Sequence, residues 1–145
     1  MMHLSKKIQL SLCVVLLVAA AACRGNGANT TAGTAGVRVT DVTLGRSVGG
    51  DKAITDRTDT FKPNDTIYVS VATDGAASSA ILRAKWSFED GQLVNESTRT
   101  IAPVNKERTE FHIAKPDGWP AGKYKLEVFL NDQLTETKNF DVRGS

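Results

Sequence analysis

Between residues 80 and 88, apolar and polar side chains alternate at every position. Ala80, Leu82, Ala84, Trp86 and Phe88 fall on one side, while the residues between them are mostly polar or charged. A period of two residues is that of an extended strand, since a helix repeats about every 3.6 residues. We therefore predict a β-strand here, with one face in a core and the other in water.

Shorter alternating segments continue this pattern. We predict further strands near residues 37–44, 67–71, 93–101, 111–113, 124–130 and 134–142, and we expect residues 45–60 to form a loop. A phase slip near Asp41 predicts a β-bulge, and Glu89-Asp90-Gly91 and Asn131-Asp132 predict hairpin turns. Seven or eight strands over residues 37–143 favour an all-β antiparallel sandwich. We expect its apolar inner faces to fill the interior.

Charge argues against nucleic acid as a partner. The chain has 18 Lys and Arg against 16 Asp and Glu, and Lys6 and Lys7 lie in the first 22 residues. Without that segment, 18 − 2 = 16 basic side chains balance 16 acidic ones. Nucleic-acid-binding proteins usually carry a surplus of basic side chains on one face. The residues after position 22 carry no such surplus.

The N-terminal segment is typical of an export signal. Residues 1–7 are basic, and residues 8–22 contain no charged side chain. This uncharged run is shorter than the about 20 residues that span a bilayer, and it suits a signal-peptide core. We therefore expect residues 1–22 to be a signal peptide that is removed. Cys13 leaves with it, so Cys23 is the only remaining thiol and no disulfide can form within the mature chain.

The segment Ala20-Ala21-Ala22-Cys23 resembles a lipobox, the processing motif of bacterial lipoproteins, with Ala20 where leucine is usual. The resemblance implies that lipid on Cys23 anchors the protein to a membrane of the cell envelope. Arg24, where aspartate would favour the inner membrane, implies the outer membrane. Residues 23–36 are rich in Gly, Ala, Thr and Asn and predict a flexible tether. The alternative is an ordinary signal peptide with an incidental Cys23.

The predicted domain resembles the immunoglobulin-like β-sandwiches of bacterial envelope proteins. Trp86 stands where their third strand carries a core tryptophan, and Gly122-Lys-Tyr124-Lys-Leu126 resembles a tyrosine corner, with Pro120 where aspartate would be usual. The resemblance implies an immunoglobulin-like fold over about residues 37–143. It also implies that Trp86, Tyr124 and Leu126 belong to the structural core.

Catalytic motifs are scarce after residue 22. His112 is the single histidine there, no GxSxG motif occurs, and Asp51, Asp56, Asp59 and Asp65 lack the spacing of a calcium loop. Residues 51–65 therefore read as a solvated loop rather than a calcium site. We expect no catalytic residue, no metal site and no cofactor.

Two aromatic residues are candidate partner-binding residues. Trp119 lies in a turn-rich segment, and Phe129 is expected to face away from the core. Alternatively, Trp119 caps one end of the sandwich and Phe129 packs beside Ile81. The sequence thus predicts a non-catalytic, membrane-anchored envelope lipoprotein that binds a protein or glycan. The alternatives are an accessory protein that binds a metal ion and a hydrolase with an unrecognised site.

Overall fold

A computed structural model of the chain describes residues 36–144. The predicted signal peptide (1–22), the lipidated Cys23 and the tether as far as residue 35 lie outside the described residues. Within residues 36–144, no helix is long and apolar enough to cross a membrane. The strands described there are β1 (Arg38–Val48), β2 (Ile54–Arg57), β3 (Thr60–Phe61), β4 (Ile67–Asp74), β5 (Ala80–Phe88), β6 (Gln92–Ile101), β7 (Glu107–Ile113), β8 (Gly122–Leu130) and β9 (Gln133–Val142).

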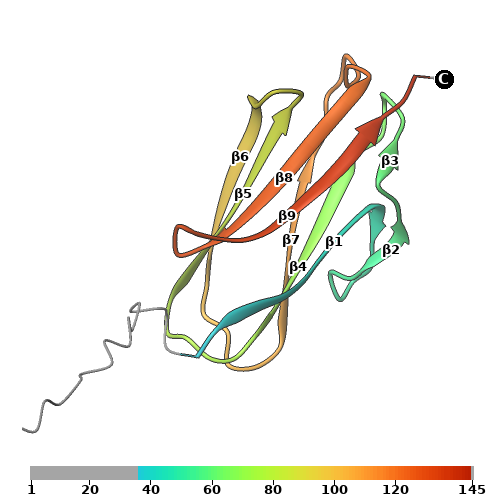
Figure 1. The fold of residues 1–145 in the computed structure, drawn as a ribbon. Coiled ribbons are helices and arrows are strands. Elements are labelled where there is room, and N and C mark those ends of the chain that lie inside the picture. Colours follow the sequence, from blue (N-terminus) through green and yellow to red (C-terminus); the bar gives the residue numbers. More distant parts are fainter. Residues whose placement is uncertain (1–35, 145) are drawn as a thin grey trace, which may run out of the picture. The chain divides into compact units, whose positions relative to one another are not determined.

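The strands form two sheets that pack face to face (Figure 1). One sheet has the order β2-β1-β4-β7 and the other has the order β3-β9-β8-β5-β6. All paired neighbours are antiparallel except β3 and β9. The chain crosses between the sheets at β2–β3, β3–β4, β4–β5, β6–β7 and β7–β8. The last three crossings are those of immunoglobulin-like sandwiches. The predicted fold class is confirmed, with nine strands in the described part instead of seven or eight.

The predicted bulge and hairpin turns are confirmed. The register between β1 and β4 shifts between Val39 and Asp41, where the apolar alternation changes phase. Asn131 and Asp132 both have positive φ, 48° and 64°, the conformation that closes a two-residue hairpin between twisted strands. At the β5–β6 turn, the Gly91 amide donates to the Phe88 carbonyl over 3.1 Å.

The prediction of a loop over residues 45–60 is wrong. β1 continues to Val48 and pairs with β2, and β3 adds a short parallel strand beside β9. The β1–β2 pairing is held by polar contacts, including an ion pair of 2.9 Å between Arg46 Nε and Asp56 Oδ2. That hydrogen bond lowers the pKa of the Asp56 carboxyl. Because β2 is an edge strand with mostly exposed side chains, it needs no apolar alternation, which is the signal that the sequence lacks.

The core is centred on Trp86, which is fully buried. Trp86 and Leu126 are register partners on β5 and β8, and both are 0% exposed. Tyr124 is 3% exposed, stacks on Phe140 with ring centroids 5.2 Å apart, and donates from its hydroxyl to the Pro120 carbonyl over 2.8 Å. This bond to backbone four residues upstream is the tyrosine-corner geometry. It ties the start of β8 to the segment that crosses from β7.

Candidate functional site

The inward face of β6 is polar, unlike those of the strands around it. The residues paired with the core positions Ala80, Leu82, Ala84 and Trp86 of β5 are Ile101, Arg99, Ser97 and Asn95, in that order. Paired residues project from the same face of a sheet. Burial of an amide or a hydroxyl without partners is costly, and in the first half of β6 the residue that packs against the core is the half-buried Val94. Among β6 residues, Ile101 alone is buried.

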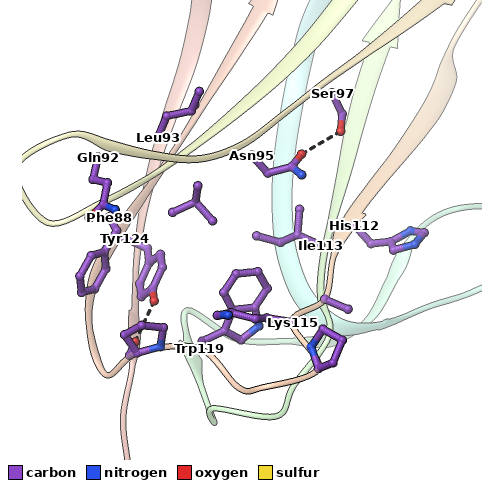
Figure 2. A pocket seen from close by; sticks show the side chains of 14 residues that line it. Phe88, Gln92, Leu93, Asn95, Ser97, His112, Ile113, Lys115, Trp119 and Tyr124 are labelled. Carbon is purple, nitrogen blue, oxygen red and sulfur yellow. Dashed lines mark hydrogen bonds between the residues drawn. The ribbon is translucent and has the colours of Figure 1, made fainter.

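A groove opens at this place, between β6 and the end of β7. Its volume is about 670 Å³, within the range of about 300–1,000 Å³ that is usual for ligand sites. Figure 2 shows Asn95 and Ser97 of β6 above the groove, Ile113 of β7 on one side, and Tyr124 on the other. The interior is filled by one cluster of buried apolar side chains, and the groove lies beside this cluster at the sheet edge. The full set of lining residues is Phe88, Gln92–Asn95, Ser97, His112–Pro116, Trp119, Pro120 and Tyr124.

Trp119 forms part of the groove wall and is itself held in the fold. Its backbone amide donates to the Pro63 carbonyl over 2.7 Å, and its indole Nε1 donates to the Asp65 carbonyl over 2.9 Å. The indole ring meets Tyr124 edge-on, with centroids 6.3 Å apart. Trp119 is 6% exposed, so it does not project into solvent, which agrees with the capping interpretation. Its role in partner binding stays a prediction. A buried tryptophan usually finds a hydrogen-bond acceptor for its indole N–H, as Trp119 does here.

Phe129 lies on the outer face of the sheet that contains β6 and is not among the groove residues. It is half-buried and pairs with Arg83, whose guanidinium carbon lies 4.0 Å from the ring centroid. Arg83 also forms ion pairs with Glu96, at 3.2 Å, and with Asp132, at 3.4 Å. A cation over an aromatic ring contributes about 0.5–1 kcal/mol at an exposed site. The structure therefore does not bring Phe129 and Trp119 together in one site.

The groove carries a positive charge and polar groups at its rim. Lys115 is its one lining lysine, and no Asp or Glu belongs to the lining within the described residues. Lys115 Nζ lies 3.9 Å from the exposed carboxylate of Asp117. On the β6 side, Ser97 Oγ donates to Asn95 Oδ1 over 3.1 Å. The arrangement suits a ligand with apolar groups and a negative charge.

The histidine of β7 is not paired with a nucleophile. His112 Nδ1 lies 2.6 Å from Glu110 Oε1, and Ser70 of β4 is the register partner of Glu110. A Ser–His–acid site needs a hydrogen bond between the hydroxyl and the imidazole. Ser70 Oγ is buried and has no hydrogen-bond partner in the described structure. Among these three side chains, the histidine contacts the carboxylate and the hydroxyl bonds to neither.

The aspartates of the 51–65 region lie apart and bond locally. Asp51 accepts from the Ala53 amide, Asp65 accepts from the Lys62 amide, and Asp56 pairs with Arg46. Within residues 36–144, no three His, Cys, Asp or Glu side chains are grouped as metal ligands would be.

Sequence reasoning missed the groove and Leu93, which is 58% exposed at its edge. The available signal was the composition of β6. Its sequence QLVNESTRTI places apolar residues at both ends and polar residues between them. A strand that packs on a core over its whole length would alternate throughout.

No family profile and no curated protein matches this sequence. Among solved structures, the chain resembles the C-terminal domain of Wzt, at 11% identity and a TM-score of 0.51, over 78% of this chain and 77% of that chain. It is also similar to an immunoglobulin-like protein from Pseudomonas aeruginosa, at 19% identity and a TM-score of 0.49, over 76% of this chain and 98% of that chain. At such identities the likeness concerns the fold alone.

Proposed function

We propose that this chain is a non-catalytic lipoprotein of the bacterial envelope whose sandwich binds a partner protein. Lipid on Cys23 anchors it to the outer membrane, and the tether of residues 23–36 gives the domain a reach of about 20 Å. Two or more acyl chains suffice for stable anchoring, because each buried methylene contributes about 0.8 kcal/mol. The observation that carries the binding function is the groove between β6 and the end of β7.

A protein partner is favoured over a glycan by the exposure of the groove residues. Trp119 and Tyr124 are 6% and 3% exposed, so neither offers an open ring face on which a sugar could stack. Leu93 is 58% exposed at the rim. An exposed apolar side chain beside a groove is a common feature of protein-binding surfaces.

The anchor is tested by Cys23→Ser. Cells fed an alkyne analogue of palmitate should label the wild-type chain and leave the variant unlabelled, since the thiol is the acylation site. Equal labelling of both chains would contradict the lipoprotein proposal.

The binding function is tested by a photoreactive amino acid placed at Leu93 in intact cells. Leu134, 53% exposed on β9 and absent from the groove lining, is the matched control position. We expect an adduct of discrete mass from position 93, lost when Asn95→Lys places a long charged side chain at the groove. The same adduct from both positions, or none from position 93, would refute binding at the groove. An adduct that glycosidases remove would favour the glycan.

A further inference from the structure

β6 ends its sheet and leaves one backbone edge open. The two sheet orders end in β7 and β6, and no strand of the described part pairs with the outer edge of β6. β6 and β7 border the same groove, and Arg99 of β6 lies over the Phe111 ring of β7, 5.9 Å from its centroid. Proteins usually protect such edges with proline, charged side chains, bulges, very short strands or covering segments. β6 is ten residues long, and its segment Asn95–Ile101 contains neither proline nor a bulge. Its two charged side chains are already engaged, Glu96 with Arg83 and Arg99 with the Phe111 ring.

The regular part of this edge is well defined. The β5–β6 register is continuous from Ile101 back to Asn95 and shifts only beyond that residue, at the bulge opposite Trp86 and Ser87. A bulge ends regular pairing, so the segment Asn95–Ile101 is the part that another strand could match. Along it, alternate N–H and C=O groups point outward in the plane of the sheet. An extended polypeptide backbone can satisfy such a row of groups along its whole length.

We propose that an extended segment of the partner protein pairs with β6 along Asn95–Ile101 as an added strand. This inference rests on the proposed protein-binding function and names its mode. Alternate side chains of the added strand project toward the groove, beside the inward-facing Asn95 and Ser97. An apolar side chain fills the space that the polar inward face of β6 leaves empty.

Charge specifies the segment further. Lys115 is the lining lysine, and none of the described lining residues is Asp or Glu, so a carboxylate of the partner is attracted to Lys115 and competes there with Asp117. Lys115 is held only by a contact of 3.9 Å to the 91% exposed Asp117 side chain. The preferred segment therefore combines a strand-forming apolar residue with an Asp or Glu near the Lys115 end of the groove.

The test uses the full chain in detergent and a displayed library of random twelve-residue peptides. Enriched peptides should contain an apolar residue and an acidic residue. Each backbone amide of the best peptide is then N-methylated in turn. Pairing with β6 predicts that binding weakens about three- to tenfold at every second position and stays unchanged between them. Failure to enrich any peptide, or an N-methyl scan without this period of two, overturns the added-strand mode.

Variants of the protein test the charge. Lys115→Glu should weaken binding of the acidic peptide about fivefold, while Lys106→Glu, outside the groove lining, should leave it unchanged. Equal effects of both variants would refute the role of Lys115. The cellular adduct from position 93 separates the two proposals. If it forms and no peptide binds, the protein-binding function stands and the strand mode fails; if neither occurs, both fail.

Discussion

Tyr124 performs two structural tasks at once, since its ring packs in the core while its hydroxyl binds backbone. The hydroxyl donates to the Pro120 carbonyl over 2.8 Å, and the ring stacks on Phe140. Burial, with a smaller contribution from Glu89, raises the pKa of this hydroxyl above its ordinary value. The folded state therefore favours the neutral phenol.

We predict that Tyr124→Phe lowers the free energy of unfolding by about 1 kcal/mol at neutral pH, the value of one hydrogen bond. Because the raised pKa favours the protonated phenol in the folded state, the wild type keeps its full stability below the ordinary tyrosine pKa of about 10 and loses stability as the pH rises above it. The variant should lose less over the same alkaline range. Urea denaturation at several pH values measures both effects, and parallel curves for the two proteins would contradict the pKa argument.

For Trp119, a measurement of stability can distinguish the capping interpretation from the partner-binding interpretation. We predict that Trp119→Ala costs about 3–5 kcal/mol, the usual penalty for truncating a buried tryptophan. The indole is 6% exposed and donates to the Asp65 carbonyl, so its removal leaves both a cavity and an unpaired acceptor. Leu134→Ala, at a residue that is 53% exposed, serves as control and should change stability little. An unchanged melting temperature for Trp119→Ala would disprove the capping role.

Residues whose position follows from alternation could be predicted from the sequence. Trp86 and Leu126 belong to strands that alternate clearly, and both are fully buried. The position of Trp119 depends instead on the carbonyls of Pro63 and Asp65, more than fifty positions away in the chain. No local pattern encodes such a contact, so the sequence left two interpretations open.

Among the strands, those at the centre of a sheet could be predicted from apolar alternation, whereas those at its edge were harder to predict. β4, β5 and β8 lie inside their sheets, cover the core and alternate visibly. β2 is mostly exposed and β6 faces a groove, so polar residues suit both faces of these strands. The alternation of apolar and polar residues thus indicates that one face of a strand contacts a core, and a strand without core contact need not show it. The β1–β2 pairing and the groove were missed for this same reason.

The junction between β7 and β8 depends on Gly122, which has φ of 152°. A Cβ at this position would clash with Glu89 Oε1 and with the Phe88 ring. We predict that Gly122→Ala destabilises the fold clearly more than Gly91→Ala. Gly91 also has positive φ, 115°, yet a Cβ there meets no atom within 4 Å. Alanine at either position is strained by the positive φ, so the difference between the two urea midpoints measures the steric clash of the Cβ at position 122. Equal midpoints would contradict this clash.

On the scale of the whole molecule, the sandwich is stabilised without a covalent crosslink. Both cysteines, Cys13 and Cys23, precede β1 in the sequence, and Leu126 occupies the place of the second disulfide cysteine of antibody domains. Apolar packing around Trp86, Phe61 and Phe140 replaces the disulfide, with edge-on ring contacts at 5.5 and 6.0 Å. Each fully buried large apolar side chain contributes about 1.5–3 kcal/mol.

We therefore predict that dithiothreitol leaves the urea midpoint of the purified full chain unchanged. A disulfide within the fold would constrain the unfolded state and contribute about 2–4 kcal/mol, which the reductant would remove. The double variant Cys13→Ser, Cys23→Ser is the control, because it has no thiol with which to form a crosslink between two chains. A midpoint that falls with reductant in the wild type and not in the double variant would reveal such a crosslink. Stability would then depend on pairing between molecules as well as on the packing around Trp86.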